Sequence, residues 1–115
     1  MVHYIEHVSE PWFTLISLGL KKVEGRLNKG RFAEYKNGDI IKWINNDFGR
    51  PRYCLTQITK ITNYSSFREY LTKEEIQECL PGIPNLSFGL DVYYKYYTKE
   101  NERKFGVLAL TMKRI

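Results

Sequence analysis

Hydrophobic and polar residues alternate along several short segments, and this period of two is typical of β-strands with one buried face. In residues 22–27 the apolar or small positions alternate with Lys22, Glu24 and Arg26, so Glu24 and Arg26 are predicted to point the same way. Other segments rich in apolar and β-branched residues predict strands at Tyr4–Val8, Ile40–Ile44, Arg52–Tyr64 and Val107–Met112. The last is almost entirely apolar, which predicts burial on both faces.

Three segments carry helical signals instead. After a predicted N-cap at Ser9, apolar residues recur at helical spacing from Trp12 to Leu20, and Gly19 is suited to end the helix. The same spacing assigns Trp12 and Phe13 to the core. The capping-box pattern that begins at Thr72 predicts a helix over residues 73–80, stopped by a proline and a glycine. A tyrosine-rich segment at residues 91–97 favours a third helix.

The remaining segments carry turn or loop signals, with residues 81–87 predicted as a loop and 98–103 as a turn. Several strands with about three short helices predict an α+β domain. The chain has 115 residues, of which 43% are hydrophobic, and no linker or repeat, so residues 1–115 are expected to form one domain. No apolar run is long enough for a membrane span and the first residues are unlike a signal peptide, so a soluble intracellular protein, cytoplasmic or nuclear, is expected.

The cysteines and histidines offer little for metal or redox chemistry. Cys54 and Cys79 are the only cysteines, and both are predicted to be reduced core residues rather than catalytic thiols. Residues 3–7 match the pattern H-x-x-E-H, with histidines at His3 and His7. A zinc site of this kind needs a helix and a third ligand, whereas this segment is strand-like, so no metal and no cofactor is expected.

Positive charge is concentrated in one short part of the chain. The net charge is +5, and six basic residues against two acidic ones give +4 to residues 21–36. These basic residues are Lys21, Lys22, Arg26, Lys29, Arg31 and Lys36. Such a cluster suits phosphate recognition, although solvated surface lysines would produce the same composition.

The same region carries a recognisable motif. Residues 10–13 (Glu-Pro-Trp-Phe) precede Gly19-x-Lys21-x-x-Glu24-x-Arg26, and Gly38-Asp39-Ile40-Ile41 follows. This arrangement resembles the ASCH family, the activating signal cointegrator homology domains, and so does the C-terminal segment from Tyr93 to Ala109. The resemblance covers essentially the whole chain. It implies a PUA-like β-barrel flanked by short helices, a fold used widely to bind RNA.

Family members differ in activity. The resemblance implies that small bacterial members deacetylate acetylcytidine with a lysine base and a threonine nucleophile three residues later, while other members cleave RNA or bind nucleic acid. Lys21 matches that lysine, whereas Glu24 stands in place of the threonine. A glutamate nucleophile would form a mixed anhydride rather than an ester, which weakens the amidohydrolase hypothesis.

Lys21, Glu24 and Arg26 can act together in two ways. As a binding site, the cations would hold phosphate or a base edge and Glu24 would accept from an exocyclic amine. As a catalytic site, Glu24 would transfer protons while Lys21 and Arg26 stabilise an anionic transition state. A purely structural ion pair is the third interpretation.

The sequence therefore predicts an RNA-binding or nucleotide-binding domain with a basic cleft around the motif. The alternatives are a small hydrolase, resembling an acetylcytidine amidohydrolase or a ribonuclease, that uses Lys21 and Glu24, and a protein-interaction module. Aromatic residues make up 15% of the chain and could stack on bases. At least one of the four clustered tyrosines should be partly exposed, because one helix cannot bury them all. The candidate ligand-binding residues are Lys21, Lys22, Glu24, Arg26, Lys29, Arg31, Tyr93 and Tyr97.

Overall fold

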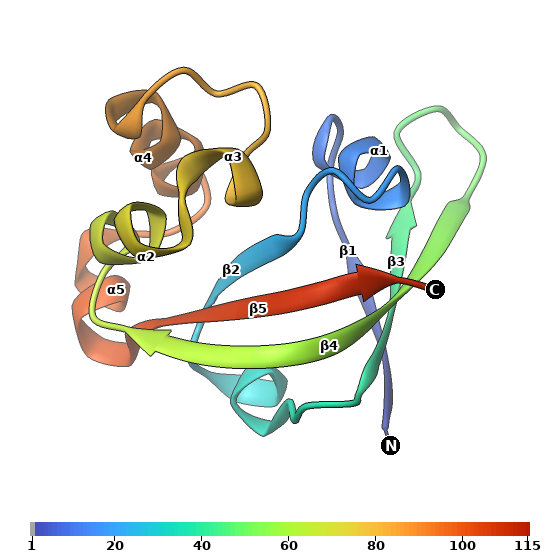
Figure 1. The fold of residues 1–115 in the computed structure, drawn as a ribbon, viewed down its shortest axis with the longest axis horizontal. Coiled ribbons are helices and arrows are strands. Elements are labelled where there is room, and N and C mark those ends of the chain that lie inside the picture. Colours follow the sequence, from blue (N-terminus) through green and yellow to red (C-terminus); the bar gives the residue numbers. More distant parts are fainter. Residues whose placement is uncertain (1) are drawn as a thin grey trace.

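The computed structural model describes residues 2–115, which form a strongly curled sheet of five strands flanked by short helices (Figure 1). The spatial order of the strands is β1-β3-β4-β5-β2, and only the β1–β3 pair is parallel. The bounds are β1 His3–His7, β2 Val23–Leu27, β3 Ile40–Asn45, β4 Arg52–Tyr64 and β5 Val107–Arg114. All five predicted strands are therefore confirmed, with small shifts at their ends.

The helices gather at two places around the sheet. One group stands beside one end of the sheet, and α1 lies over the opposite end, as Figure 1 shows. Their bounds are α1 Trp12–Ser17, α2 Phe67–Glu74, α3 Ile76–Cys79, α4 Leu86–Tyr94 and α5 Lys99–Phe105, with a 3₁₀ turn η1 at Gly30–Glu34. Short helices around a curled half-barrel give the predicted α+β, PUA-like architecture.

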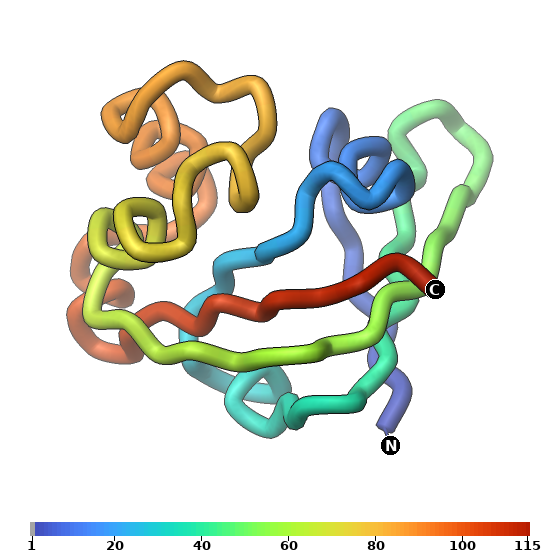
Figure 2. Tube along the Cα trace, in the orientation of Figure 1, coloured from blue at the N-terminus to red at the C-terminus, as the bar shows by residue number. Residues whose placement is uncertain are grey.

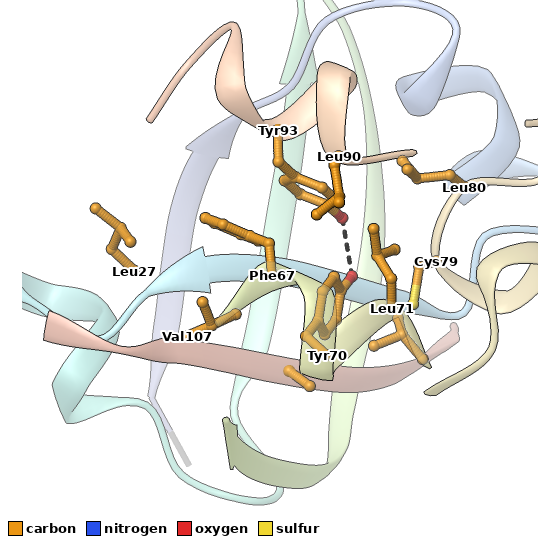
Figure 3. Packing of buried hydrophobic residues seen from close by; sticks show 11 residues of the cluster. Leu27, Phe67, Tyr70, Leu71, Cys79, Leu80, Leu90, Tyr93 and Val107 are labelled. Atoms are coloured by element: carbon orange, nitrogen blue, oxygen red, sulfur yellow. Dashed lines mark hydrogen bonds between the residues drawn. The ribbon is translucent and has the colours of Figure 1, made fainter. Parts of the chain in front are cut away.

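Strand β5 separates two hydrophobic cores. Val107 and Ala109 face the core that the sheet forms with α2, α3 and α4, whereas Leu110 and Met112 face the core inside the curl, under α1. Figure 3 shows the first core, where Tyr70 points toward α4. The predicted burial of this strand on both faces is confirmed, because successive side chains of a strand point to opposite sides.

Two expectations about where helices begin are wrong. Ser9 does not cap α1 with its side chain; Pro11 precedes the helix without a capping bond, and Glu10 accepts from the Thr14 amide at 2.9 Å. The segment predicted as one helix over residues 73–80 contains the end of α2 and the separate helix α3. Helix α2 begins at Phe67, because the Ser66 side chain accepts from the Glu69 amide while the Glu69 carboxylate accepts from the Ser65 amide. Residue 72 lies inside that helix.

The C-terminal region is also more helical than the sequence predicted. Residues 98–103 do not form a turn, because the Thr98 side chain accepts from the Asn101 amide and thereby starts α5. The predicted loop over residues 81–87 ends earlier, where Asn85 caps α4. Gly19 ends α1 with a φ of +76°, as predicted.

The curl of the sheet brings its two edge strands, β1 and β2, opposite each other (Figure 2). Side chains rather than a backbone ladder connect them: Arg26 Nη2 donates to the His7 carbonyl at 3.4 Å. Arg31, just after β2, donates from Nη2 to Glu6 Oε1 of β1 at 2.6 Å. We call this boundary the β1–β2 seam. The candidate site lies at one end of it, beside His7 and Arg26.

Candidate ligand-binding site

A cavity of about 370 Å³ lies at the end of the β1–β2 seam. Its walls come from the ends of β1 and β2, the β3–β4 loop, and helices α1 and α4. The polar and aromatic side chains that line it include Trp12, Lys21, Glu24, Arg26, Asn45, Asn46, Asp47, Tyr93, Tyr96 and Tyr97. A cavity of this volume is within the range of sites for small organic ligands.

Lys21 is buried at the base of this cavity, with only 2% of its surface exposed. Its ammonium group donates to the Val23 carbonyl at 2.8 Å and to the Cys79 carbonyl at the end of α3. The third partner is Glu24, whose Oε1 lies 3.3 Å from Nζ. All three N–H donors of the ammonium therefore have partners within the protein.

Glu24 is the centre of a charged group of three side chains. Its Oε1 also accepts from the Gly25 amide at 3.0 Å, and its Oε2 lies 3.1 Å from Arg26 Nη2. Burial by itself would raise the pKa of Glu24, but the positive charges of Lys21 and Arg26 outweigh it and lower the pKa below the ordinary value. Glu24 is thus a carboxylate and a hydrogen-bond acceptor at neutral pH.

Arg26 lies over two aromatic rings. Its guanidinium carbon lies 5.3 Å from the centre of the Phe32 ring and 5.4 Å from that of Trp43. Nη2 donates to Glu24 and to the His7 carbonyl, whereas the buried Nε has no hydrogen-bond partner among residues 2–115. Arg26 and Glu24 lie on one face of β2, as the alternation of residues predicted.

Helix α4 and the residues that follow it supply the aromatic side of the cavity. Tyr93 is buried and its hydroxyl shares a hydrogen bond of 2.8 Å with that of Tyr70, the dashed line in Figure 3. Tyr97 stacks on the buried Phe67, with ring centres 5.3 Å apart. Burial raises the pKa of both Tyr93 and Tyr97, although the nearby Arg26 opposes each shift. Both tyrosines are therefore protonated and neutral at the cavity wall.

The structure separates the remaining basic candidates from this cavity. Lys22 is exposed after α1, and its backbone amide donates to the Glu78 carbonyl. Lys29 lies beyond the far end of β2, and Arg31 is bound to Glu6 in the seam. The structure thus brings Lys21, Glu24, Arg26, Tyr93 and Tyr97 together around one cavity but leaves Lys22, Lys29 and Arg31 outside it.

The H-x-x-E-H segment has a different role. Residues His3 and His7 lie on the extended strand β1, as predicted, which keeps the two imidazoles apart. Glu6 points to the opposite, buried face of the strand, where it accepts from Arg31 Nε at 2.7 Å and from the Tyr35 hydroxyl. No group of three or more potential metal ligands occurs within residues 2–115.

Sequence reasoning missed part of the cavity wall. Trp12, which helical spacing assigned to the core together with Phe13, is only half-buried and lines the cavity; Phe13 alone is core. Tyr96 is 62% exposed at the rim, which confirms that one tyrosine of the cluster is exposed. The polar residues 45–47 at the end of β3 were assigned only to a loop, although three polar residues after an apolar strand were a usable signal.

The cysteines contribute no reactive group. Both are buried and unpaired, as predicted. Burial raises the pKa of the Cys79 thiol to about 11, so it is not a thiolate at neutral pH. No helix among residues 2–115 combines the length and the apolar content that crossing a lipid bilayer requires.

Comparisons with known proteins agree with the fold. No protein with a curated function matches the chain. The crystal structure of the hypothetical protein PH0355 is similar, with 35% identity, a TM-score of 0.88 and coverage of 99% of this chain and 100% of that one. The solution NMR structure of protein PF0455 from Pyrococcus furiosus has 32% identity, a TM-score of 0.79 and coverage of 99% and 98%. The ASCH domain profile matches residues 7–115, and the chain belongs to the ASCH domain family.

Proposed function

We propose that this ASCH domain binds RNA or a nucleotide and holds one base in the cavity at the end of the β1–β2 seam. The observation that carries the proposal is the pairing of Glu24 with Arg26 in the wall of an aromatic cavity. This combination offers an acceptor, a donor and flat apolar surfaces to the same ligand. Bases are recognised by hydrogen bonds to their edges and by stacking on their faces.

The charges of the cavity suit a base better than a bare phosphate. Lys21 and Arg26 are balanced by Glu24 and by Asp47, which also lines the cavity. A carboxylate accepts a hydrogen bond from an exocyclic amine, as carboxylates do with cytosine. The donors of Arg26 that Glu24 and the His7 carbonyl do not occupy can serve a carbonyl or ring nitrogen on the same edge. Cytosine and adenine fit this pattern better than uracil.

The contacts of Lys21 and Glu24 favour binding over hydrolysis. A lysine base needs a free lone pair, but Lys21 Nζ donates to two carbonyl groups and to Glu24. A general acid must be protonated, and the lowered pKa of Glu24 keeps it ionised. We therefore assign Lys21 to positioning Glu24, and Glu24 to accepting a hydrogen bond from the ligand.

Tryptophan fluorescence tests the binding proposal directly. Trp12 lines the cavity whereas Trp43 is fully buried, so quenching reports a base that stacks near Trp12. Cytidine 5′-monophosphate is expected to bind roughly tenfold more tightly than uridine 5′-monophosphate, because uracil lacks the exocyclic amine. Equal affinities, or an absence of quenching by both nucleotides and by single-stranded RNA, would contradict the proposal.

Two tyrosines of equal exposure provide a matched pair of variants. Tyr96 at the cavity rim and Tyr53 on β4 are each 62% exposed, but only Tyr96 lines the cavity. Tyr96→Ala is expected to weaken nucleotide binding by roughly tenfold through lost stacking, and Tyr53→Ala to leave it unchanged. The same loss in both variants would argue against a base in this cavity.

A direct assay decides between binding and the hydrolase alternative. Purified protein is incubated with acetylcytidine and with labelled RNA, and the products are compared with those of Glu24→Gln. Neither deacetylation nor cleavage is expected. Turnover that Glu24→Gln abolishes would instead establish an enzyme that depends on Glu24.

A further inference from the structure

A second group of cations lies outside the cavity, at the far end of β2. There the Asn28 amide donates to the Gly106 carbonyl at 3.1 Å, which ties the end of β2 to the start of β5. This bond places Lys29 beside Phe105, the last residue of α5. The ammonium groups of Lys29 and Lys104 each lie 5.2 Å from the centre of the Phe105 ring.

These two lysines come from different elements and converge without a counterion. Neither forms an ion pair with any acidic side chain of residues 2–115, where the pairs are Lys21–Glu24, Arg26–Glu24, Arg31–Glu6 and Arg52–Glu10. Because both ammonium groups lie 5.2 Å from the same ring centre, they are at most about 10 Å apart, a separation over which physiological salt screens their repulsion only in part. An anion that contacts both lysines would lower this repulsion.

Arginines and an aromatic ring connect this group to the cavity. The guanidinium carbon of Arg26, in the cavity wall, lies 5.3 Å from the centre of the Phe32 ring. That of Arg31 lies 5.1 Å from the centre of the same ring. Arg31 is more than half exposed even though it is bound to Glu6, and it follows Lys29 by two residues. Two pairs of cations, Arg26 with Arg31 at Phe32 and Lys29 with Lys104 at Phe105, are thus joined by the two-residue step from Lys29 to Arg31.

We propose that Lys29 and Lys104, around Phe105, form a second subsite that binds a phosphodiester of a single-stranded polynucleotide whose one base occupies the cavity. The proposal rests on the proposed function of the cavity. Successive phosphates of a single strand can follow a row of cations, and lysines act as point charges for them. The ligand is then an oligonucleotide rather than a free nucleotide, and its affinity depends on its length.

The test compares ligands of different length on the full chain. Cytidine 5′-monophosphate reaches the cavity alone, whereas a single-stranded cytidine octanucleotide can also reach Lys29 and Lys104. The octanucleotide is expected to bind at least tenfold more tightly, with a steeper loss of affinity as salt rises. Equal affinity of the two probes for the wild-type protein would overturn the second subsite.

Two double lysine-to-alanine variants test which lysines contribute to octanucleotide binding. The K29A/K104A variant is expected to bind the octanucleotide roughly tenfold more weakly, with a shallower salt dependence, and to keep its affinity for cytidine 5′-monophosphate. The K60A/K113A variant removes the same charge from exposed positions of β4 and β5 outside the cavity. It is expected to bind both probes nearly as the wild type does, and an equal loss in the two variants would refute the subsite.

The two proposals fail in different ways. If the wild-type protein binds neither cytidine 5′-monophosphate nor the octanucleotide at millimolar concentration, the cavity proposal fails and the subsite proposal fails with it. If the mononucleotide binds but K29A/K104A leaves octanucleotide binding unchanged, only the second subsite is wrong. Circular dichroism and thermal unfolding of each variant ensure that an affinity change is not a loss of fold.

Discussion

Lys21 and Glu24 form a buried ion pair in which Nζ and Oε1 lie 3.3 Å apart. Both side chains are shielded from water, and Lys21 also satisfies the carbonyl of Cys79 at the end of α3. The pair therefore links β2 to the helical group while it fixes the carboxylate that faces the cavity. A buried charge needs such partners, because removing one leaves the other unpaired in a medium of low polarity.

Replacing Lys21 should be strongly destabilising. Lys21→Met is expected to reduce the free energy of unfolding by about 3 kcal/mol, because it leaves two carbonyl groups without a donor and Glu24 without its closest cation. Urea unfolding followed by fluorescence measures the change. Lys22→Met alters an exposed neighbour with the same chemistry and is expected to change stability by less than about 0.5 kcal/mol. Similar losses in the two variants would contradict the role assigned to Lys21.

Two glycines should respond in opposite directions to the same substitution. A Cβ atom at Gly25 would lie 2.7 Å from the ring of Tyr70, which is fully buried and bonded to Tyr93, so Gly25→Ala should destabilise by about 1–3 kcal/mol. At Gly89, in α4, the closest atom would be a Leu71 methyl at 3.1 Å, which can move. Gly89→Ala should be neutral or stabilising by up to about 1 kcal/mol through helix propensity. Thermal unfolding compares them, and a stabilising Gly25→Ala would refute the packing argument.

The start of α2 can be checked by removing two hydroxyl groups in turn. Ser66 accepts from the Glu69 amide at 3.1 Å, so Ser66→Ala should reduce the free energy of unfolding by about 1 kcal/mol. Thr72 lies inside the helix, where its hydroxyl donates to the Arg68 carbonyl and caps nothing. Thr72→Ala should therefore be neutral or slightly stabilising. A larger loss in Thr72→Ala would place the cap at residue 72 instead.

Acid should weaken the closure of the β1–β2 seam. Burial alone would raise the pKa of Glu6, but hydrogen bonds from Arg31 and Tyr35 lower it below the ordinary value of 4.5. As the pH falls, the unfolded chain is protonated first, so the stability that Glu6 contributes is complete above pH 4.5 and is lost below it. The free energy of unfolding of the wild type is expected to fall steeply in that range.

Glu6→Gln tests which group causes this dependence. The variant should be less stable at pH 7 by about 2 kcal/mol, because it replaces charged hydrogen bonds by neutral ones. Its stability should then vary less between pH 7 and pH 3 than that of the wild type. Glu34→Gln changes an exposed acid without an ion pair among the described residues and should leave the profile unchanged. An unaltered pH profile in Glu6→Gln would show that other carboxylates govern acid unfolding.

The strands could be predicted from the sequence because their signal is local. Alternation in residues 22–27 and β-branched residues in Arg52–Tyr64 mark half-buried extended chain wherever the segment lies in the fold. The helix ends were less predictable, because Ser66 and Thr72 both begin a plausible capping box and only packing decides between them. Burial of Phe67, Tyr70 and Leu71 in one core selects the earlier start.

The candidate site could be predicted only in part. The motif identified Lys21, Glu24 and Arg26, which are close in sequence and meet in the structure. Trp12, Tyr96 and residues 45–47 come from three distant segments, so no local pattern could place them at one cavity. That residues 1–115 form a single domain stays a prediction.

The sequence by itself determined the strand-forming segments, the ASCH motif and the concentration of positive charge in residues 21–36. Only the tertiary structure decided how that charge is used. The curl of the sheet sets β1 against β2, so Arg31 meets Glu6 and Arg26 meets the His7 carbonyl, while Lys29 meets Lys104 around Phe105. The physical reason is that ion pairing and burial depend on partners far away in the chain, which charge and spacing in one segment do not specify.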